Sequence, residues 1–318
     1  MTQLIAMLLS AVLTFVGMPM FIQYFQQKKL GQTTREDGPL WHEVKTGTPT
    51  MGGTIFILAS IITICIFAIV MHQWNIHTMM IVLTLALFGG IGFVDDFISI
   101  FKKQNEGLTA KQKFTLQNIF AGMIILIPFI FNEPIEISFI HWVIQNQWII
   151  IIFGMIWING FSNAVNLTDG LDGLATGLNI IAYSAYAIIA YFEGNMTVNV
   201  SCLVVVASLI AFLYYNHKPA KIFMGDVGSL ALGAGLSTIS LILNNPWSLL
   251  IIGFVFIVET LSVILQVASF KTRGKRIFKM SPIHHHFEMS GWSEEKVVIN
   301  FWIVGALMAI IMISLTLI

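Results

Sequence analysis

Ten long apolar runs, separated by short polar stretches, constrain the fold of this chain more than any other feature. A membrane-spanning helix needs about 20 mainly apolar residues, because the hydrocarbon core is about 30 Å thick and each helical residue rises about 1.5 Å. Strands of a membrane barrel would be about half as long and would alternate in polarity. We therefore predict one all-α integral-membrane domain over residues 1–318, a polytopic protein with ten transmembrane helices. The predicted spans cover residues 3–24, 51–71, 78–98, 114–131, 147–163, 174–192, 198–214, 229–243, 247–268 and 297–317.

The composition agrees with a membrane protein. Hydrophobic types make up 57% of the residues and charged types only 10%, far below the roughly 25% of soluble domains. The first apolar run lacks a basic start and a small-residue cleavage site, so it is expected to be a span and not a signal peptide. Cys65 and Cys202 stand in different apolar runs without ligand-like spacing, which argues against a disulfide or a metal site.

The basic residues are segregated along the chain. If the chain changes side at every span, five loops lie together, and all 16 Lys and Arg residues fall in them. Basic residues in short loops are retained in the cytoplasm. We therefore expect a multi-pass protein of the cell membrane with these loops inside and both termini outside. The five loops are 25–50, 99–113, 164–173, 215–228 and 269–296.

The third span ends in an acidic pair, Asp95-Asp96, where an apolar helix reaches the inner interface. Ionisable residues at membrane depth are usually functional. Adjacent helical side chains point about 100° apart, so the two carboxylates are expected to divide roles instead of forming one clamp. One would lie near a metal or act as a base, and the other would orient a partner. The alternative is a solvated helix end.

Two further inner segments carry polar side chains among small residues. The segment 163–173 contains Asn163, Asn166 and Asp169, with small and flexible residues between its amides and carboxylates, which suits a tight fold around a polar ligand. It lacks the closing Glu of a calcium loop, and its alternative interpretation is a turn with helix caps.

The segment 216–229 combines Asn216, Phe223, Asp226 and glycines ahead of a helix. Asp226 could hold Mg²⁺ and Phe223 could stack on a planar base, unless the segment is only a basic loop with Phe223 anchored in the interface.

The last inner loop carries three consecutive histidines, His284, His285 and His286, after a basic run. Consecutive residues rarely converge on one tetrahedral ion, so zinc is the weaker interpretation. The neighbouring basic residues favour another interpretation, in which the imidazoles contact phosphate oxygens or the sugar of a substrate. Lys45 and Lys111 add positive charge to the inner face. Glu259, inside the ninth span, is expected either to line a polar cleft or to hydrogen-bond to a neighbouring helix.

These motifs together resemble the polyprenyl-phosphate N-acetylhexosamine-1-phosphate transferase superfamily, and within it the phospho-N-acetylmuramoyl-pentapeptide-transferases (translocase I). The resemblance covers the whole chain, and its most discriminating pieces are 47–53, Asp95-Asp96, 163–173, 220–229 and 282–288. That family is similar in having ten spans, outward termini and a cytoplasmic site. It implies that UDP-N-acetylmuramoyl-pentapeptide reacts with undecaprenyl phosphate to give lipid I and UMP, with Mg²⁺ as cofactor.

The resemblance also implies roles for residues at matching positions. Asp226 is the implied Mg²⁺ ligand, Asp95 the base or lipid-phosphate partner, and Asp96 a second acidic member, while Phe223 matches a uracil-stacking ring. For the lysine ahead of the fourth span, Lys111 and Lys113 both fit within one turn. The implied catalytic set is Asp95, Asp96, Asp226 and His285. The implied substrate-binding set is Lys45, Lys111, Asn163, Asn166, Asp169, Asn216, Phe223, His284 and His286.

Several alternatives stay open. The phosphoryl group could move by one in-line displacement or through an aspartyl-phosphate. A related transferase would carry N-acetylglucosamine-1-phosphate instead. A transporter, from a different class, would place ionisable residues near the centre of several spans, whereas only Glu259 is plainly central here. The expected partners are the UDP-linked donor, undecaprenyl phosphate and membrane lipid, with no nucleic acid and with a homodimer as one allowed assembly.

Overall fold

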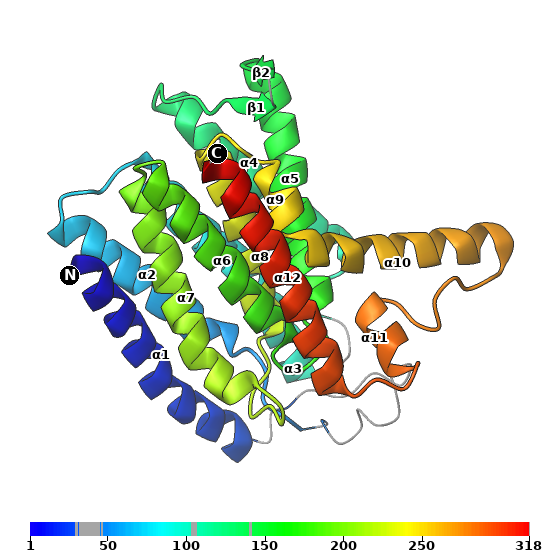
Figure 1. Ribbon diagram of the computed structural model, residues 1–318. Helices are drawn as coiled ribbons and strands as arrows, with labels where there is room; N and C mark the ends of the chain where they lie inside the picture. The colour runs from blue at the N-terminus through cyan, green and yellow to red at the C-terminus, as the bar shows by residue number, and fades with distance from the viewer. Residues whose placement is uncertain (29–30, 32–44, 46, 103–106, 140–141, 318) are drawn as a thin grey trace.

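The computed structural model describes residues 1–28, 31, 45, 47–102, 107–139 and 142–317 (Figure 1). The basic residues Lys29, Arg35 and Lys103 of the predicted inner loops lie outside this part of the chain. The elements in order are α1 (Thr2–Gln27), α2 (Gly53–Val70), α3 (Ile76–Lys102), α4 (Ala110–Ile130), β1 (Ile137–Phe139), β2 (Trp142–Ile144), α5 (Gln147–Thr168), α6 (Leu174–Phe192), α7 (Met196–Asn216), α8 (Gly225–Ile242), α9 (Ser248–Ile252), α10 (Phe254–Arg273), α11 (Ile283–Glu288) and α12 (Glu294–Leu317).

The prediction of an all-α protein with ten spans is confirmed. Among the described residues, ten helices are long and apolar enough to cross a membrane. Their ends differ from the predicted spans mainly where polar residues continue a helix. α5 runs on to Thr168, and α8 begins at Gly225 instead of 229. The added turns carry Asn166 and Asp226, whose side chains bond to each other and so are satisfied without leaving the helix.

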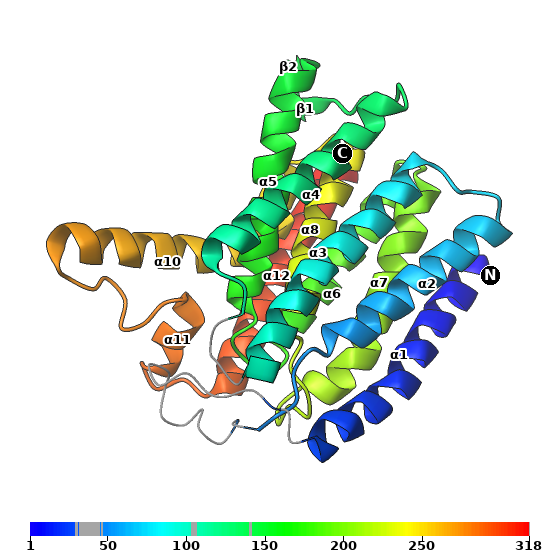
Figure 2. The same ribbon diagram turned by 180° about the vertical axis from the view of Figure 1, so that it is seen from behind.

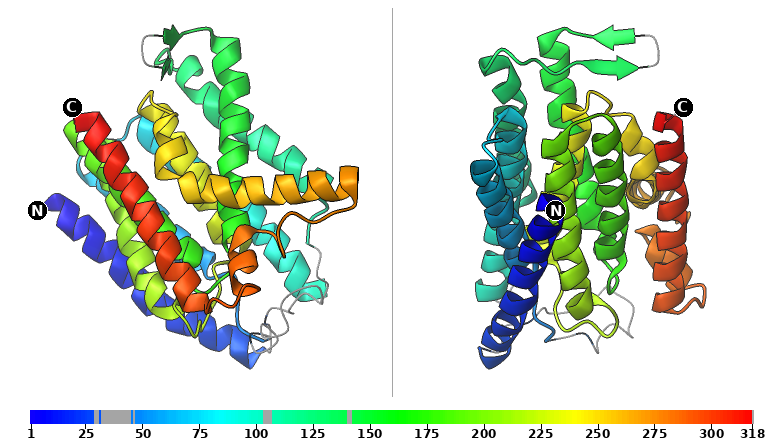
Figure 3. Two further views of the ribbon diagram at one scale, coloured as in Figure 1. Left: turned by 45° about the vertical axis from the view of Figure 1, so that its right-hand side comes forward. Right: turned by 60° about the vertical axis from the view of Figure 1, so that its left-hand side comes forward.

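The ninth span departs from the prediction of one helix over 247–268. It is divided at Gly253 into the short α9 and the long α10. α10 then projects sideways from the bundle (Figures 1 and 3). A side chain at residue 253 would crowd the Leu249 carbonyl at 2.7 Å and the Phe161 ring at 2.9 Å, so glycine permits the change of direction there. Uniform apolarity along the run conceals this break.

Two small elements were not predicted. β1 and β2 form an antiparallel hairpin with Ile137 opposite Ile144, and α11 is a short helix that carries the three histidines. The hairpin and both chain termini lie at one end of the bundle, as the side views show (Figure 3). The connection from α7 to α8 lies at the opposite end. This arrangement agrees with the predicted alternation of the spans.

α8 occupies the middle of the bundle. Its residues from Val227 to Ile242 are all buried, and α3 and α5 pack on it. In lipid, where tails are as apolar as leucine, helix association depends on close packing, and small residues permit it. α8 is accordingly rich in Gly, Ala and Ser. At Gly233 a methyl group would overlap the backbone carbonyl of Phe161 in α5, so the two helices touch at the backbone.

A second glycine contact positions polar side chains. A methyl group at Gly92 of α3 would overlap the backbone of Asp226 at the start of α8. Gly92 lies one turn before Asp95 and Asp96, so this approach brings the inner end of α3 against the first turn of α8. The view from behind shows α3 and α4 running together on that side of the molecule (Figure 2).

We predict that Gly233→Ala lowers the thermal stability of the protein in detergent, because the added methyl must push α5 away from α8. The matched control is Gly160→Ala in α5, where a methyl would meet nothing within 4 Å. Alanine is favoured over glycine in helices by about 1 kcal/mol, so the control should be neutral or stabilising. Thermal unfolding of both purified variants measures the difference, and equal melting temperatures would contradict the backbone contact.

Candidate active site

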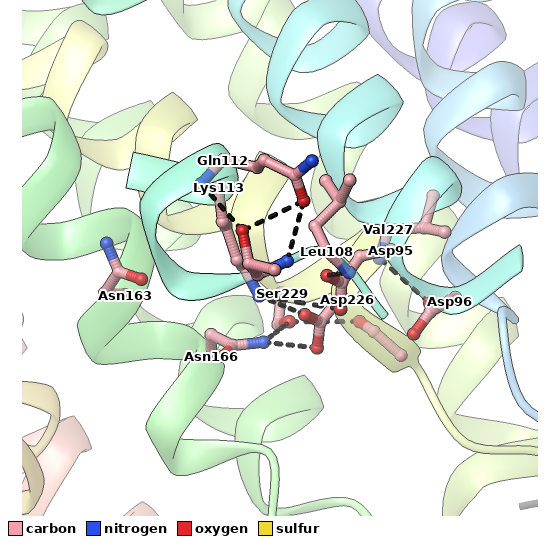
Figure 4. A network of polar contacts seen from close by, with 12 residues as sticks. Asp95, Asp96, Leu108, Gln112, Lys113, Asn163, Asn166, Asp226, Val227 and Ser229 are labelled. Atoms are coloured by element: carbon pink, nitrogen blue, oxygen red, sulfur yellow. Dashed lines mark hydrogen bonds and ion pairs between the residues drawn. The ribbon is translucent and has the colours of Figure 1, made fainter. Parts of the chain in front are cut away.

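Three carboxylates converge at the end of the bundle opposite the termini. Asp95 and Asp96 come from the last part of α3, and Asp226 is the second residue of α8. One oxygen of each lies within 4.8 Å of the others (Figure 4). We call these three residues the acidic cluster. Among the described residues, no other group of three or more His, Cys, Asp or Glu side chains brings its ligand atoms together in this way.

A lysine on α4 faces the acidic cluster. The ammonium of Lys113 donates to Asp226 and lies 3.8 Å from Asp95 Oδ2. Thr109 and Gln112 form a capping box that begins α4, and the backbone N–H of Leu108 donates to Asp95 Oδ1 at 2.8 Å. The cap and this bond fix the start of α4 beside Asp95, and the Lys113 side chain reaches the carboxylates.

Of the two lysines that fitted the pattern, only Lys113 reaches the cluster. Lys111 is exposed, two residues earlier on the same first turn of α4. Side chains two positions apart on a helix face different directions. The sequence alone did not show which of the two lysines faces the carboxylates.

Asp96 and Asn166 make hydrogen bonds to the first turn of α8, where Asp226 lies. Asp96 Oδ2 accepts from the backbone N–H of Val227 at 3.3 Å, so it caps an open N–H at the start of α8. Asn166 Nδ2 donates to Asp226 Oδ1 at 2.7 Å and to Ser229 Oγ at 2.9 Å. These bonds hold the Asp226 carboxylate in one orientation (Figure 4).

Asp169 follows α5 and lies close to the acidic cluster. Burial raises the pKa of its carboxyl to about 7, and the negative charge of Asp226 acts in the same direction. A hydrogen bond from the backbone N–H of Gly225 opposes these effects in part. Asn163 lies farther back on α5 (Figure 4). It donates to Gln117 Oε1 at 3.1 Å and to the Asn159 carbonyl at 2.8 Å.

The connection from α7 to α8 is held by backbone and amide contacts. Asn216 is buried, accepts from Thr176 Oγ1 at 2.6 Å and donates to the Ile222 carbonyl at 3.0 Å. The Phe223 backbone pairs with Pro49 and Gly52 ahead of α2 at 2.9 Å each. Asn216 therefore supports the connection, while the half-buried ring of Phe223 stands on a fixed backbone.

The three histidines point to different partners. His284 is buried, and its Nδ1 lies 3.1 Å from Glu259 Oε1 on α10. His285 Nδ1 lies 2.8 Å from Glu288, while His286 accepts from the backbone N–H of Lys279 at 3.1 Å. Such divergence does not form a zinc site. Glu259 thus makes the hydrogen bond to a neighbouring helix that was one of its two predicted roles.

His284 also packs on the segment that follows α5. A methyl group at Gly170 would overlap the His284 ring at Nε2. The glycine next to Asp169 therefore lets α11 approach that segment, so the histidines and Asp169 border the same region.

Lys45 forms ion pairs with two carboxylates that do not belong to the acidic cluster. Its ammonium lies 2.7 Å from Asp172 and 2.5 Å from Glu294. Burial acts to lower the pKa of Lys45, but the charges of Glu294 and Asp172 outweigh it and raise the pKa. Sequence reasoning did not single out Glu294, because an acidic residue in the first turn of a helix is common for dipole reasons alone.

Comparisons with known proteins agree with this geometry. Residues 78–244 match the model of glycosyl transferase family 4. A phospho-N-acetylmuramoyl-pentapeptide-transferase of Lactobacillus acidophilus is 52% identical over 98% of this chain and 97% of its own. Proteins of the same name from Enterococcus faecalis (52% identical, 95% of this chain and 94% of its own) and Listeria innocua (48%, 94% of each) are also similar. The chain therefore belongs to the phospho-N-acetylmuramoyl-pentapeptide-transferases, a family of membrane enzymes.

Proposed function

We propose that this chain transfers phospho-N-acetylmuramoyl-pentapeptide from its UDP-linked donor to undecaprenyl phosphate, giving lipid I and UMP for peptidoglycan synthesis. The observation that carries the proposal is the convergence of Asp95, Asp96 and Asp226 beside Lys113. Phosphoryl transfer depends mainly on positioning and on neutralising the charge of the phosphates. The Lys113 ammonium, together with a cation held by the three carboxylates, would supply the positive charge. The segregation of basic residues supports a cytoplasmic site, where a nucleotide donor would be available.

The acidic cluster fits Mg²⁺. The ion prefers hard oxygen ligands and usually takes one or two carboxylates together with substrate phosphates. We assign Asp226 as its principal ligand, since Asn166 already orients that carboxylate and Asp96 secures the helix end beneath it. When bound, Mg²⁺ would screen the negative charge of the diphosphate and of the departing UMP.

Lys113 and Asp95 are the residues we assign to the acceptor. The ammonium of Lys113 reduces the repulsion between the lipid phosphate and the donor phosphates. The last proton of a phosphate ester has a pKa of about 6, so most of the acceptor is already ionised at neutral pH. Asp95 then needs only to take the remaining proton at its carboxylate, before the phosphate oxygen displaces UMP in line.

The donor occupies the neighbouring part of the site. The Phe223 ring offers a face for uracil, and its backbone is held by Pro49 and Gly52. Asn216 keeps the connection to α8 in place. Asp169, Lys45 and the imidazoles of His285 and His286 supply polar contacts to the nucleotide and the sugar, while His284 braces the segment that bears Asp169. Asn163 supports α5 behind Asn166.

Release of UMP tests the proposed function directly. Purified protein is mixed with UDP-N-acetylmuramoyl-pentapeptide and undecaprenyl phosphate, and UMP and lipid I are quantified. We expect equal amounts of both products with Mg²⁺, and loss of turnover after chelation that Mg²⁺ restores. Turnover that persists unchanged in excess chelator would overturn the metal assignment, and UMP without lipid product would overturn the acceptor.

Asp226→Asn should reduce kcat by about a hundredfold or more, because it removes a charged ligand at the reacting phosphates. The protein should stay folded, since an amide can still interact with Asn166. Asp172→Asn is not a suitable control, because that residue pairs with Lys45. Glu295→Gln changes the same charge at an exposed position and should retain normal turnover. Near-normal kcat in Asp226→Asn would refute the assignment.

The two lysines at the start of α4 give a matched pair. Lys113→Gln should lower kcat at least about tenfold, because the acidic cluster and the phosphates lose their neutralising cation. Lys111→Gln removes the same charge from the exposed side of the same turn and should change kcat by less than about twofold. Steady-state kinetics of both variants decide between them. Equal losses would show that only the net charge of the loop matters.

A further inference from the structure

Glu294, the first residue of α12, is buried against three separate segments of the site. Its side chain is only 7% exposed, although it stands at a helix end where solvent would be close. Burial of a carboxylate is costly unless the charge is paired and hydrogen-bonded. The partners of Glu294 therefore matter more than its place on the helix.

Each oxygen of Glu294 has a donor. Oε1 accepts from Lys45 Nζ at 2.5 Å and from the backbone N–H of Asp172 at 2.9 Å. Oε2 lies 3.2 Å from Lys218 Nζ. The donors come from the segment before α2, the α5–α6 connection and the α7–α8 connection. One side chain on α12 thus joins three segments that are far apart in the sequence.

Asp172 completes the network. Its Oδ1 accepts from Lys45 Nζ at 2.7 Å, and its Oδ2 accepts from the backbone N–H of Ala220 at 3.0 Å. Two carboxylates and two ammonium groups cancel in charge, so the network is electrically balanced without the acidic cluster. The Lys45 side chain is 20% exposed, so it is not sealed off from the solvent.

The network borders the proposed donor site. Asp172 lies three residues after Asp169, and Ala220 lies three residues before Phe223. The Phe223 backbone is in turn paired to Pro49 and Gly52 in the segment that follows Lys45. Within the described part of the chain, the hydrogen bonds and ion pairs of Glu294 go to Lys45, Asp172 and Lys218, and not to the acidic cluster. A change at Glu294 should therefore disturb the donor side of the site and leave the reacting end in place.

We propose that Glu294 is a positioning residue for the UDP-linked donor: it holds the Lys45 ammonium and the connection that bears Phe223 where nucleotide binding needs them. This inference rests on the proposed function for the identity of the donor. Glu294 acts through Lys45 and the backbone, and contacts no reacting atom. A purely stabilising ion pair would instead change the melting temperature and leave the kinetic constants alone.

The test compares Glu294→Gln with Glu295→Gln in the full-length protein. Both remove one negative charge from the first turn of α12, but Glu295 is exposed. We expect Glu294→Gln to raise the KM for the donor about tenfold or more, because the half-buried Lys45 ammonium loses a charged partner, as does the more exposed Lys218. Its kcat and its KM for undecaprenyl phosphate should change less than about twofold. Glu295→Gln should match the unaltered protein in all three constants.

A double-variant cycle shows whether Glu294 acts through Lys45. In the Lys45→Gln background, the further change Glu294→Gln should raise the donor KM by much less than it does alone. Glu294→Asp keeps the charge and should recover part of the donor affinity. Full additivity with Lys45→Gln, or a loss confined to kcat, would overturn the proposal, as would a lower melting temperature with unchanged KM.

Binding of UDP separates this inference from the proposed function. Calorimetry with UDP and Mg²⁺ needs no turnover, and weaker binding in Glu294→Gln but not in Glu295→Gln would support the role of Glu294. If the unaltered protein released no UMP, the proposed reaction would fail while this comparison still held. Equal UDP affinity in both variants would refute the positioning role even if the transferase reaction were established.

Discussion

The contact between α3 and α8 is the constraint on which the rest of the site depends. Gly92 lets the backbone of α3 meet the first turn of α8, and this approach brings Asp95 and Asp96 to Asp226. Three carboxylates so close together repel one another, and the Lys113 ammonium offsets part of that repulsion. Small residues let helices pack closely, which helix association in a membrane requires. In this protein the same close packing brings the charged groups together.

Much of the fold follows from the sequence, because hydrophobic length and loop charge are strong signals in a membrane. Nine of the ten spans were predicted to within five residues at each end, and the start of α1 and the end of α12 lie at one end of the bundle. The division of the ninth run at Gly253 and the β1–β2 hairpin were missed. Both involve contacts between distant segments, here of residue 253 with Phe161 and of Ser138 in β1 with the Asn244 carbonyl, which periodicity does not record.

The sequence indicated which residue types form the candidate site, but not the directions in which their side chains point. Asp95 and Asp96 stood out because carboxylates are costly at the edge of a bilayer, and Asp226 because it stands among glycines ahead of a helix. The structure brings the three together. The choice between Lys111 and Lys113 depends on which face of α4 meets α3, and the residue pattern of the sequence does not determine that face. Glu294 was missed because its partners, Lys45 and Lys218, are more than 70 residues away in the sequence.

The burial of α8 bears on how the position of the acidic cluster responds to the thickness of the bilayer. A helix that meets lipid must adjust its tilt when the bilayer thickens or thins. Residues Val227 to Ile242 meet only protein, so the depth of Asp226 is set by neighbouring helices. Outer helices such as α1 and α12, with many exposed apolar side chains, absorb that mismatch. A change in bilayer thickness should therefore shift the outer helices more than the acidic cluster.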